Sequence, residues 1–184
     1  MAFITDSSDK GPNGVIVVDL SSEESWRRLH DHPTTKAEQP PDFLPMVEGR
    51  PLMQRNPDGS TNPMTIGADG IAIGADGERL YYCKLMGRHL YSVSTDALCD
   101  RSLGDGDVAR TVVHEGDKGG AGDGMETDAA GNIYATNFEH NAVLRRQPDG
   151  QWETVAHDLR LLWPDTLSVA ADGYLYVTPG AGRQ

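Results

Sequence analysis

The chain has 184 residues and a formal net charge of −12, from 16 lysines and arginines against 28 aspartates and glutamates. This charge repels nucleic acid and anionic membrane surfaces, so we expect neither as a partner, although acidity alone is common in soluble proteins. Hydrophobic residues make up 38% of the chain, which argues against disorder, and 21 glycines with 11 prolines favour an all-β chain rich in turns.

The sequence carries no signal for membrane insertion or secretion. No run approaches the roughly eighteen apolar residues of a spanning helix, and the opening MAFITDSSDKG lacks the charged and apolar regions of a signal peptide. The two cysteines, Cys83 and Cys99, form neither a disulfide framework nor a metal-binding pair, so we expect free thiols.

The first predicted elements are a strand over residues 2 to 5 and an apolar strand over 15 to 20. The segment SSEESWRRL, residues 21 to 29, has the capping serines and acidic first turn of a helix, but an outer strand competes with that helix and we favour the strand. Residues 31 to 63 are rich in proline and show little alternation, which predicts a long loop or insertion with at most a short edge strand.

A repeat then begins at residue 69. The strings DGIAIGADGERLYYC, DGMETDAAGNIYAT and DTLSVAADGYLYVT start at Asp69, Asp123 and Asp165, and each has a turn glycine eight positions after its aspartate. Asp-Gly and Ala-Gly favour the positive φ angles of a tight hairpin turn, so these glycines are structural. The predicted strands that follow the glycines are residues 80–83, 133–136 and 175–178, and further apolar runs cover 89–93 and 142–144.

Each repeat therefore reads as the four-stranded antiparallel sheet of a propeller blade. The intervals of 54 residues from Asp69 to Asp123 and 42 from Asp123 to Asp165 suit blades of about 40 to 50 residues. We predict an all-β, incomplete β-propeller of about three and a half to four blades, forming one domain over residues 1–184. Because blades need neighbours on both faces, we expect a longer propeller or closure by a second copy of the chain.

The three repeated aspartates are the candidate functional residues. Equivalent positions in successive blades converge on the propeller axis, so Asp69, Asp123 and Asp165 are predicted to bind a hard divalent cation, Ca²⁺ rather than Zn²⁺. Asp123 is also the predicted catalytic base. Without a metal, the carboxylates should repel one another and at least one pKa should rise. The alternative is that each aspartate only shapes the turn before its strand.

Four other residues are predicted to bind substrate near the tunnel. Lys118, in the glycine-rich GDKGGAG connection, would orient a substrate, since this segment lacks the residues of a phosphate-binding loop. Asn137 and His140 follow an inner strand and would line the tunnel mouth, although a histidine on a surface loop is the alternative. Trp163 would form a tunnel wall, or simply fill a gap between blades. No GxSxG string is present, which disfavours a serine nucleophile.

The segments ITDS, GVIVVDL, DGIAIGADGERLYYCKLMGRHLYSVSTDAL, GDKGGAGDGMETDAAGNIYATNFEHNAV and LLWPDTLSVAADGYLYVT together resemble the bacterial branch of the major royal jelly protein and yellow family. This resemblance covers nearly the whole chain outside the proline-rich segment. It implies a six-bladed propeller, similar in architecture to the senescence marker protein and gluconolactonase group, whose tunnel holds a divalent cation. A secreted or periplasmic full-length protein is compatible with the family.

The resemblance also implies roles for single residues. Asp69 stands where the gluconolactonase group has an asparagine, Asp123 where it has a metal-binding and catalytic aspartate, and Asp165 at the matching point of the next blade. The glutamate of that group's first blade has no counterpart here. The implied function is metal-assisted hydrolysis of a small lactone. The alternative is a non-catalytic propeller that binds a small ligand or a protein partner, with yellow-type pigment-precursor chemistry as a further enzymatic variant.

Overall fold

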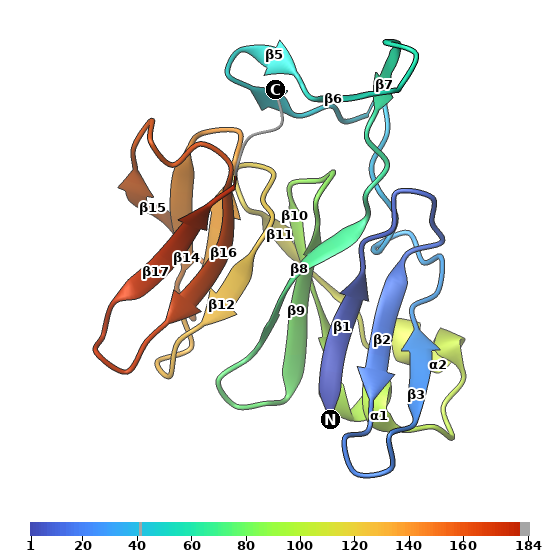
Figure 1. Cartoon of the computed structure of the whole chain (residues 1–184). Coiled ribbons are helices and arrows are strands. Elements are labelled where there is room, and N and C mark those ends of the chain that lie inside the picture. Colours follow the sequence, from blue (N-terminus) through green and yellow to red (C-terminus); the bar gives the residue numbers. More distant parts are fainter. Residues whose placement is uncertain (41, 181–184) are drawn as a thin grey trace.

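The computed structural model describes residues 1–40 and 42–180, so Pro41 of the predicted insertion and residues 181–184 of the predicted domain lie outside it. Nearly all of its regular structure is β-strand. Four antiparallel sheets stand side by side in chain order, and their first strands contact one another in the sequence β1, β8, β12, β16 (Figure 1). This arrangement confirms the predicted all-β, incomplete propeller.

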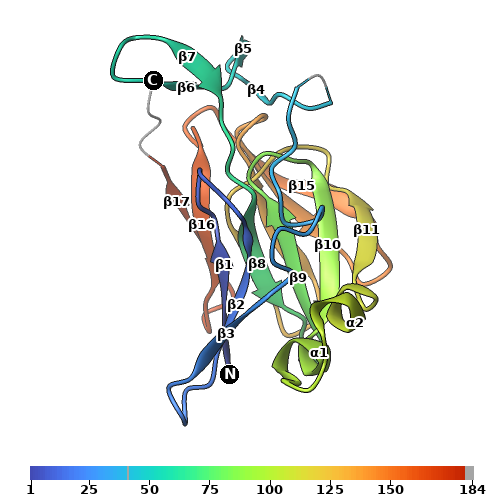
Figure 2. The same cartoon turned by 90° about the vertical axis from the view of Figure 1, so that its right-hand side faces the viewer.

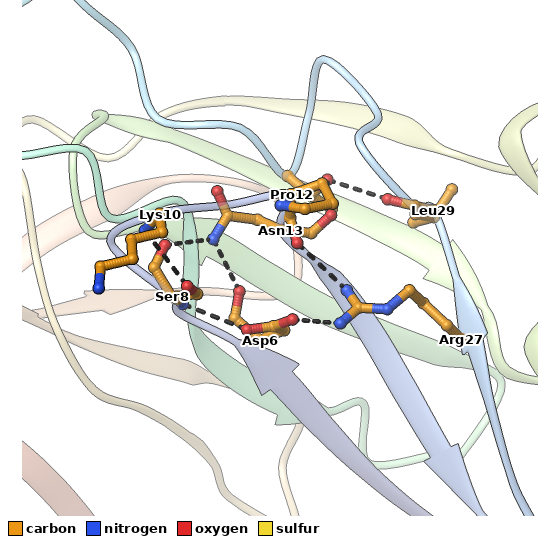
Figure 3. Close-up of polar contacts among 8 residues, drawn as sticks. Asp6, Ser8, Lys10, Pro12, Asn13, Arg27 and Leu29 are labelled. Atoms are coloured by element: carbon orange, nitrogen blue, oxygen red, sulfur yellow. Dashed lines mark hydrogen bonds and ion pairs between the residues drawn. The ribbon is translucent and has the colours of Figure 1, made fainter.

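The first sheet has three strands and lacks the leading half of a repeat, as the sequence indicates. Its strands are β1 (Ala2–Asp6), β2 (Gly14–Val18) and β3 (Ser25–Arg28). The connection from β1 to β2 is held by Asn13, whose Nδ2 donates to the carbonyl oxygens of Asp6 and Ser8, both at 2.9 Å, and by an ion pair between Arg27 and Asp6 (Figure 3). Residues 25–28 form a strand and not a helix, which confirms the preferred interpretation of that segment.

Two complete four-stranded sheets follow. The second sheet contains β8 (Ala68–Ile73), β9 (Arg79–Lys84), β10 (His89–Ser94) and β11 (Val113–Asp117). The third contains β12 (Met125–Thr127), β13 (Ile133–Asn137), β14 (Ala142–Arg146) and β15 (Trp152–His157). The fourth has β16 (Pro164–Val169) and β17 (Leu175–Pro179). The repeated turn glycines 77, 131 and 173 all have φ near +80°, at 77°, 85° and 84°, as the repeat predicts.

Two short helices were not predicted. They are α1 (Thr95–Cys99) and α2 (Asp105–Ala109), inserted between β10 and β11. The Ser94 hydroxyl accepts a hydrogen bond from the Ala97 N–H and caps α1, which is a signal that the sequence did offer. The buried Arg28 of β3 donates to the carbonyl oxygens of Leu98, Asp100 and Leu103, so the helical segment ties the second sheet to the first.

The proline-rich segment holds two small hairpins at the opposite end of the sheets from the helices, as both views show (Figures 1 and 2). These hairpins consist of β4 (Met46–Val47) with β5 (Arg50–Pro51), and β6 (Met53–Arg55) with β7 (Thr61–Pro63). Phe43 of this segment is buried in an apolar cluster with Leu85, Ala121 and Phe138. The segment therefore covers the end of the sheets at which β8 begins.

The apolar core lies between neighbouring sheets. One cluster joins the first and second sheets through Val15, Val17, Leu80 and Tyr82, and another joins the second and third sheets through Cys83, Leu90, Met125 and Ile133. Cys83 and Cys99 are both free thiols, and Cys83 is fully buried. Within residues 1–40 and 42–180, no helix has the length and apolarity needed to cross a membrane.

Neighbouring first strands approach closely at a glycine. A β-carbon added at Gly124 would lie 2.2 Å from the carbonyl oxygen of Asp165 in the next sheet, and one at Gly70 would lie 2.5 Å from that of Asp123. Backbone atoms cannot move aside as a flexible side chain can. The glycine after each of the first two repeated aspartates therefore sets the spacing between sheets.

We expect Gly124→Ala to lower the free energy of unfolding by about 1 to 3 kcal/mol, because the added methyl group overlaps the neighbouring backbone. Urea unfolding measures this loss. Gly106→Ala is the matched control, since its β-carbon would meet nothing within 4 Å and it lies in α2, where alanine is favoured. Equal stability of the two variants would contradict this account of the inter-sheet contact.

Candidate functional site

Each repeated aspartate lies at the start of an inner strand, and Asp69 and Asp165 lie in β-bulges. In β8, Ala68 pairs with Lys84 and Ile71 with Tyr82, so two residues face one on the partner strand. A bulge of this kind bends the strand and re-aims its side chains. The two bulged pairs and their opposite residues are Asp69–Gly70 with Cys83 and Asp165–Thr166 with Thr178, whereas Asp123 and Gly124 directly precede β12.

Threonine hydroxyl groups on the second strand hold the backbone beside two of the repeated aspartates. Thr136 Oγ1 accepts hydrogen bonds from the backbone N–H groups of Asp123, at 2.8 Å, and Gly124, at 3.1 Å. Thr178 Oγ1 accepts one from the Thr166 N–H at 3.1 Å. Sequence reasoning did not assign these threonines, although their recurrence at the end of the second strand of successive repeats was a usable signal.

The structure brings Asp69 and Asp123 together. Their carboxyl groups are in hydrogen-bond contact across the boundary between the second and third sheets. Burial, followed by the charge of Asp123 and the hydrogen bond with it, raises the pKa of Asp69 to about 8, and a hydrogen bond from Ser7 opposes that shift. At neutral pH the pair therefore shares a proton. The expected rise in at least one pKa is present, with burial as its largest cause.

Asp123 also accepts a hydrogen bond from the side chain of Trp163. Burial raises its pKa, while hydrogen bonds from Trp163 and Asp69 act in the opposite direction. The Trp163 Nε1–H donates to Asp123 Oδ2 at 2.8 Å, and the indole stacks on Phe138 with ring centroids 4.3 Å apart. Trp163 has a φ of +50°, an uncommon angle for a large side chain, which the surrounding contacts impose.

Asp165 lies near the pair and does not join it. Its charge raises the pKa of both Asp69 and Asp123. Its own Oδ1 accepts a hydrogen bond from the Thr166 hydroxyl at 3.2 Å. In the part of the chain that the structure describes, no group of three or more His, Cys, Asp or Glu side chains has a geometry suited to a metal ion.

The proline-rich segment is anchored over this end of the sheets by Glu139. The Glu139 carboxylate accepts two hydrogen bonds from Arg88, both at 2.8 Å, and one each from the backbone N–H groups of Ala121, at 2.8 Å, and Met46, at 3.1 Å. Burial would raise the pKa of Glu139, but these donors outweigh it and hold that pKa below its usual range. Nothing in the sequence indicated this anchor, because its partners lie 18 to 93 residues away.

The predicted substrate-binding residues divide into two groups. Trp163 contacts Asp123, as described. Lys118, Asn137 and His140 instead line a separate hollow of about 510 Å³, beside strands β14 and β15. Asn137 Oδ1 lies 3.1 Å from His140 Nδ1, and neither Asp69 nor Asp123 lines this hollow.

Comparison with known proteins gives one family match. The family model described as Major royal jelly protein matches residues 1–179. No curated protein sequence matches the chain.

Several solved structures resemble the chain. A streptogramin B lyase is 14% identical with a TM-score of 0.51, over 96% of this chain and 55% of that one. A gluconolactonase from Xanthomonas campestris is 20% identical with a TM-score of 0.48, over 70% of this chain and 41% of that one. A calcium-binding regucalcin from Agrobacterium tumefaciens is 17% identical with a TM-score of 0.46, over 96% and 64%. The chain spans only part of each neighbour, and likeness at this level shows the fold alone.

The raised pKa of Asp69 predicts a pH-dependent stability. Between the usual pKa of about 4 and the folded value of about 8, the unfolded chain releases a proton that the folded chain retains, so rising pH destabilises the fold. We expect the stability of the wild type relative to Asp69→Asn to fall across this window, by at most about 1.4 kcal/mol per pH unit, and to level off above it. Thermal unfolding at a series of pH values measures this difference.

Asp96→Asn is the control for that experiment, because Asp96 is an exposed carboxyl on α1. The Asp96→Asn variant keeps the Asp69–Asp123 pair, so its own stability should fall across this window as that of the wild type does. A wild type that becomes more stable relative to Asp69→Asn as pH rises from 5 to 8 would contradict the shared proton.

Removing the Glu139 anchor should detach the covering segment. We expect Glu139→Ala to lower the free energy of unfolding by about 2 to 4 kcal/mol, because the Ala121 and Met46 N–H groups and Arg88 all lose their acceptor. Hydrogen exchange at Met46 and Ala121 should accelerate as well. Glu153→Ala, which removes an exposed ion pair with Arg145, is the control and should cost less than about 1 kcal/mol. Unchanged exchange at Met46 would rule out the anchoring role.

Proposed function

The chain belongs to the major royal jelly protein family, and we propose that its Asp69–Asp123 pair is the centre of a lactonase-like activity, the hydrolysis of a small lactone assisted by a divalent cation. The feature that carries this proposal is the approach of two half-buried carboxyl groups at the start of adjacent inner strands, where burial and their proximity raise the pKa of Asp69. Pairs of carboxyl groups in different protonation states are typical of sites that perform acid and base catalysis.

The chain's own residues support both halves of a hydrolysis. Asp123, held by the Trp163 N–H, would accept a proton from the water that attacks the lactone carbonyl. Asp69, protonated at neutral pH, would supply a proton to the ring oxygen when its bond to the carbonyl carbon breaks. The product is a hydroxy acid, and the pair then exchanges one proton with solvent to regain its starting state. The apolar cluster around Phe43 and Phe138 would limit access of bulk water.

The carboxylate oxygens of Asp69 and Asp123 are suitable ligands for a hard cation, but two side chains are too few to fill its coordination shell. Asp69 and Asp123 offer adjacent carboxylate oxygens, the ligands that Ca²⁺ prefers over the nitrogen and sulfur ligands typical of Zn²⁺. The described residues supply no third acidic, histidine or cysteine ligand in place, so backbone carbonyls, water or Asp165 would have to complete the shell. When bound, a cation would polarise the lactone carbonyl.

A second candidate is a non-catalytic propeller that binds a small molecule or a protein at the same end. The incomplete ligand cluster favours this alternative. Family membership is compatible with both candidates, because a fold does not fix a function.

The two candidates differ in calorimetry and in kinetics. With the lactonase-like function, titrated CaCl₂ binds with a dissociation constant of about 1 mM or tighter, and D-glucono-1,5-lactone is hydrolysed above its spontaneous rate. Asp123→Asn should lower kcat by about 10²- to 10⁴-fold, and Asp96→Asn should leave it unchanged. Cation binding without hydrolysis supports the non-catalytic candidate. Absence of both Ca²⁺ and Zn²⁺ binding would exclude the metal-assisted reaction.

A further inference from the structure

The hollow beside strands β14 and β15 contains a buried cation without an acidic partner. Lys118 is only 2% exposed, and its ammonium group donates to a single acceptor, the carbonyl oxygen of Gly120 at 3.1 Å. No carboxylate lies within 4 Å of it among the described residues. An ammonium group has three donors, and burying a lysine is costly unless its charge is paired.

Among the described residues, two other basic side chains are buried, and both lie near a carboxylate. Lys84, which is 5% exposed, lies 3.2 Å from the Glu38 carboxylate. Arg28, which is 7% exposed, donates to three carbonyl oxygens and lies 3.9 Å from Asp105. Lys118 is the most deeply buried of these three, and its acceptor is an uncharged carbonyl oxygen.

Besides Lys118, several residues with polar N–H groups line the hollow. His140 and His157 lie on its exposed rim. The Trp152 N–H, in the same wall, has no hydrogen-bond partner in the described part of the chain. Glu153 also lines the hollow, but its Oε1 accepts hydrogen bonds from Arg145, at 2.8 Å from Nε, so its charge is already compensated.

We propose that this hollow is a binding site for the oxyanion group of a small molecule, a carboxylate or a phosphate, with Lys118 as its main anchor. A volume of about 510 Å³ accommodates a molecule larger than the oxyanion alone. Asn137, which is 2% exposed, and the rim histidines provide polar contacts for the rest of the ligand. This site uses neither Asp69 nor Asp123, so it does not depend on the proposed hydrolysis.

Nuclear magnetic resonance titration of the full chain tests the site, with inorganic phosphate and gluconate as probes and sodium chloride as the ionic-strength reference. We expect the Gly119 backbone amide and the Asn137 side-chain amide to shift with either probe. Binding of phosphate alone would indicate a phosphorylated ligand, and binding of gluconate alone a carboxylate. Lys118→Met should raise the dissociation constant about tenfold or more, because a charge-assisted hydrogen bond is lost.

Two variants separate this site from general charge effects and from the axial pair. Lys10→Met removes the same charge from an exposed lysine, and Asp123→Asn alters the proposed hydrolytic centre, and both should leave phosphate and gluconate binding unchanged. If Lys118→Met does not fold, His157→Ala at the exposed rim should still weaken binding. The proposal is overturned if neither probe shifts Gly119 and Asn137 beyond the chloride reference, or if Lys118→Met and Lys10→Met bind equally.

Discussion

The close approach of neighbouring inner strands is the constraint on which the rest of the site depends. Gly70 and Gly124 bring the backbone of one sheet against the carbonyl oxygen of an aspartate in the next. Asp69 and Asp165 lie in β-bulges and Asp123 directly precedes β12, so the contact that spaces the sheets lies where the three aspartates enter the inner strands. Packing and site geometry are therefore set by the same few residues.

This approach has an electrostatic consequence. Two carboxyl groups forced together in a space with little water cannot both ionise without a large penalty, so a proton stays on Asp69 near neutral pH. The chain limits that penalty with the Trp163 hydrogen bond to Asp123 and places Asp165 where it adds to the repulsion. The proton on such a pair can be exchanged with a substrate, or it can be displaced when a cation binds to the carboxylates.

The repeat made the sheets predictable, since alternation and turn glycines act locally. Strands 80–83, 133–136 and 175–178 lie within β9, β13 and β17, and the contact between Asp69 and Asp123 follows from their equivalent positions. Features that depend on distant partners were not predictable. The Glu139 anchor joins residues far apart in the chain, and helix α1 rests on the Ser94 cap within a segment that otherwise reads as a loop. Equal spacing also failed to show that Asp165 would stay outside the pair.

The predicted substrate-binding residues are divided between the aspartate pair and the hollow because they lie on different strands of their sheets. Trp163 directly precedes the inner strand β16, so it faces the neighbouring inner strand and meets Asp123. Asn137 ends the second strand of its sheet and His140 follows that strand, while Lys118 follows the outermost strand of the preceding sheet. None of the three lies on an inner strand. Proximity in the repeat therefore does not mean proximity to the axis. A blade presents different chemistry at its inner and outer strands, and one propeller end can hold an acidic pair and a basic hollow without either neutralising the other.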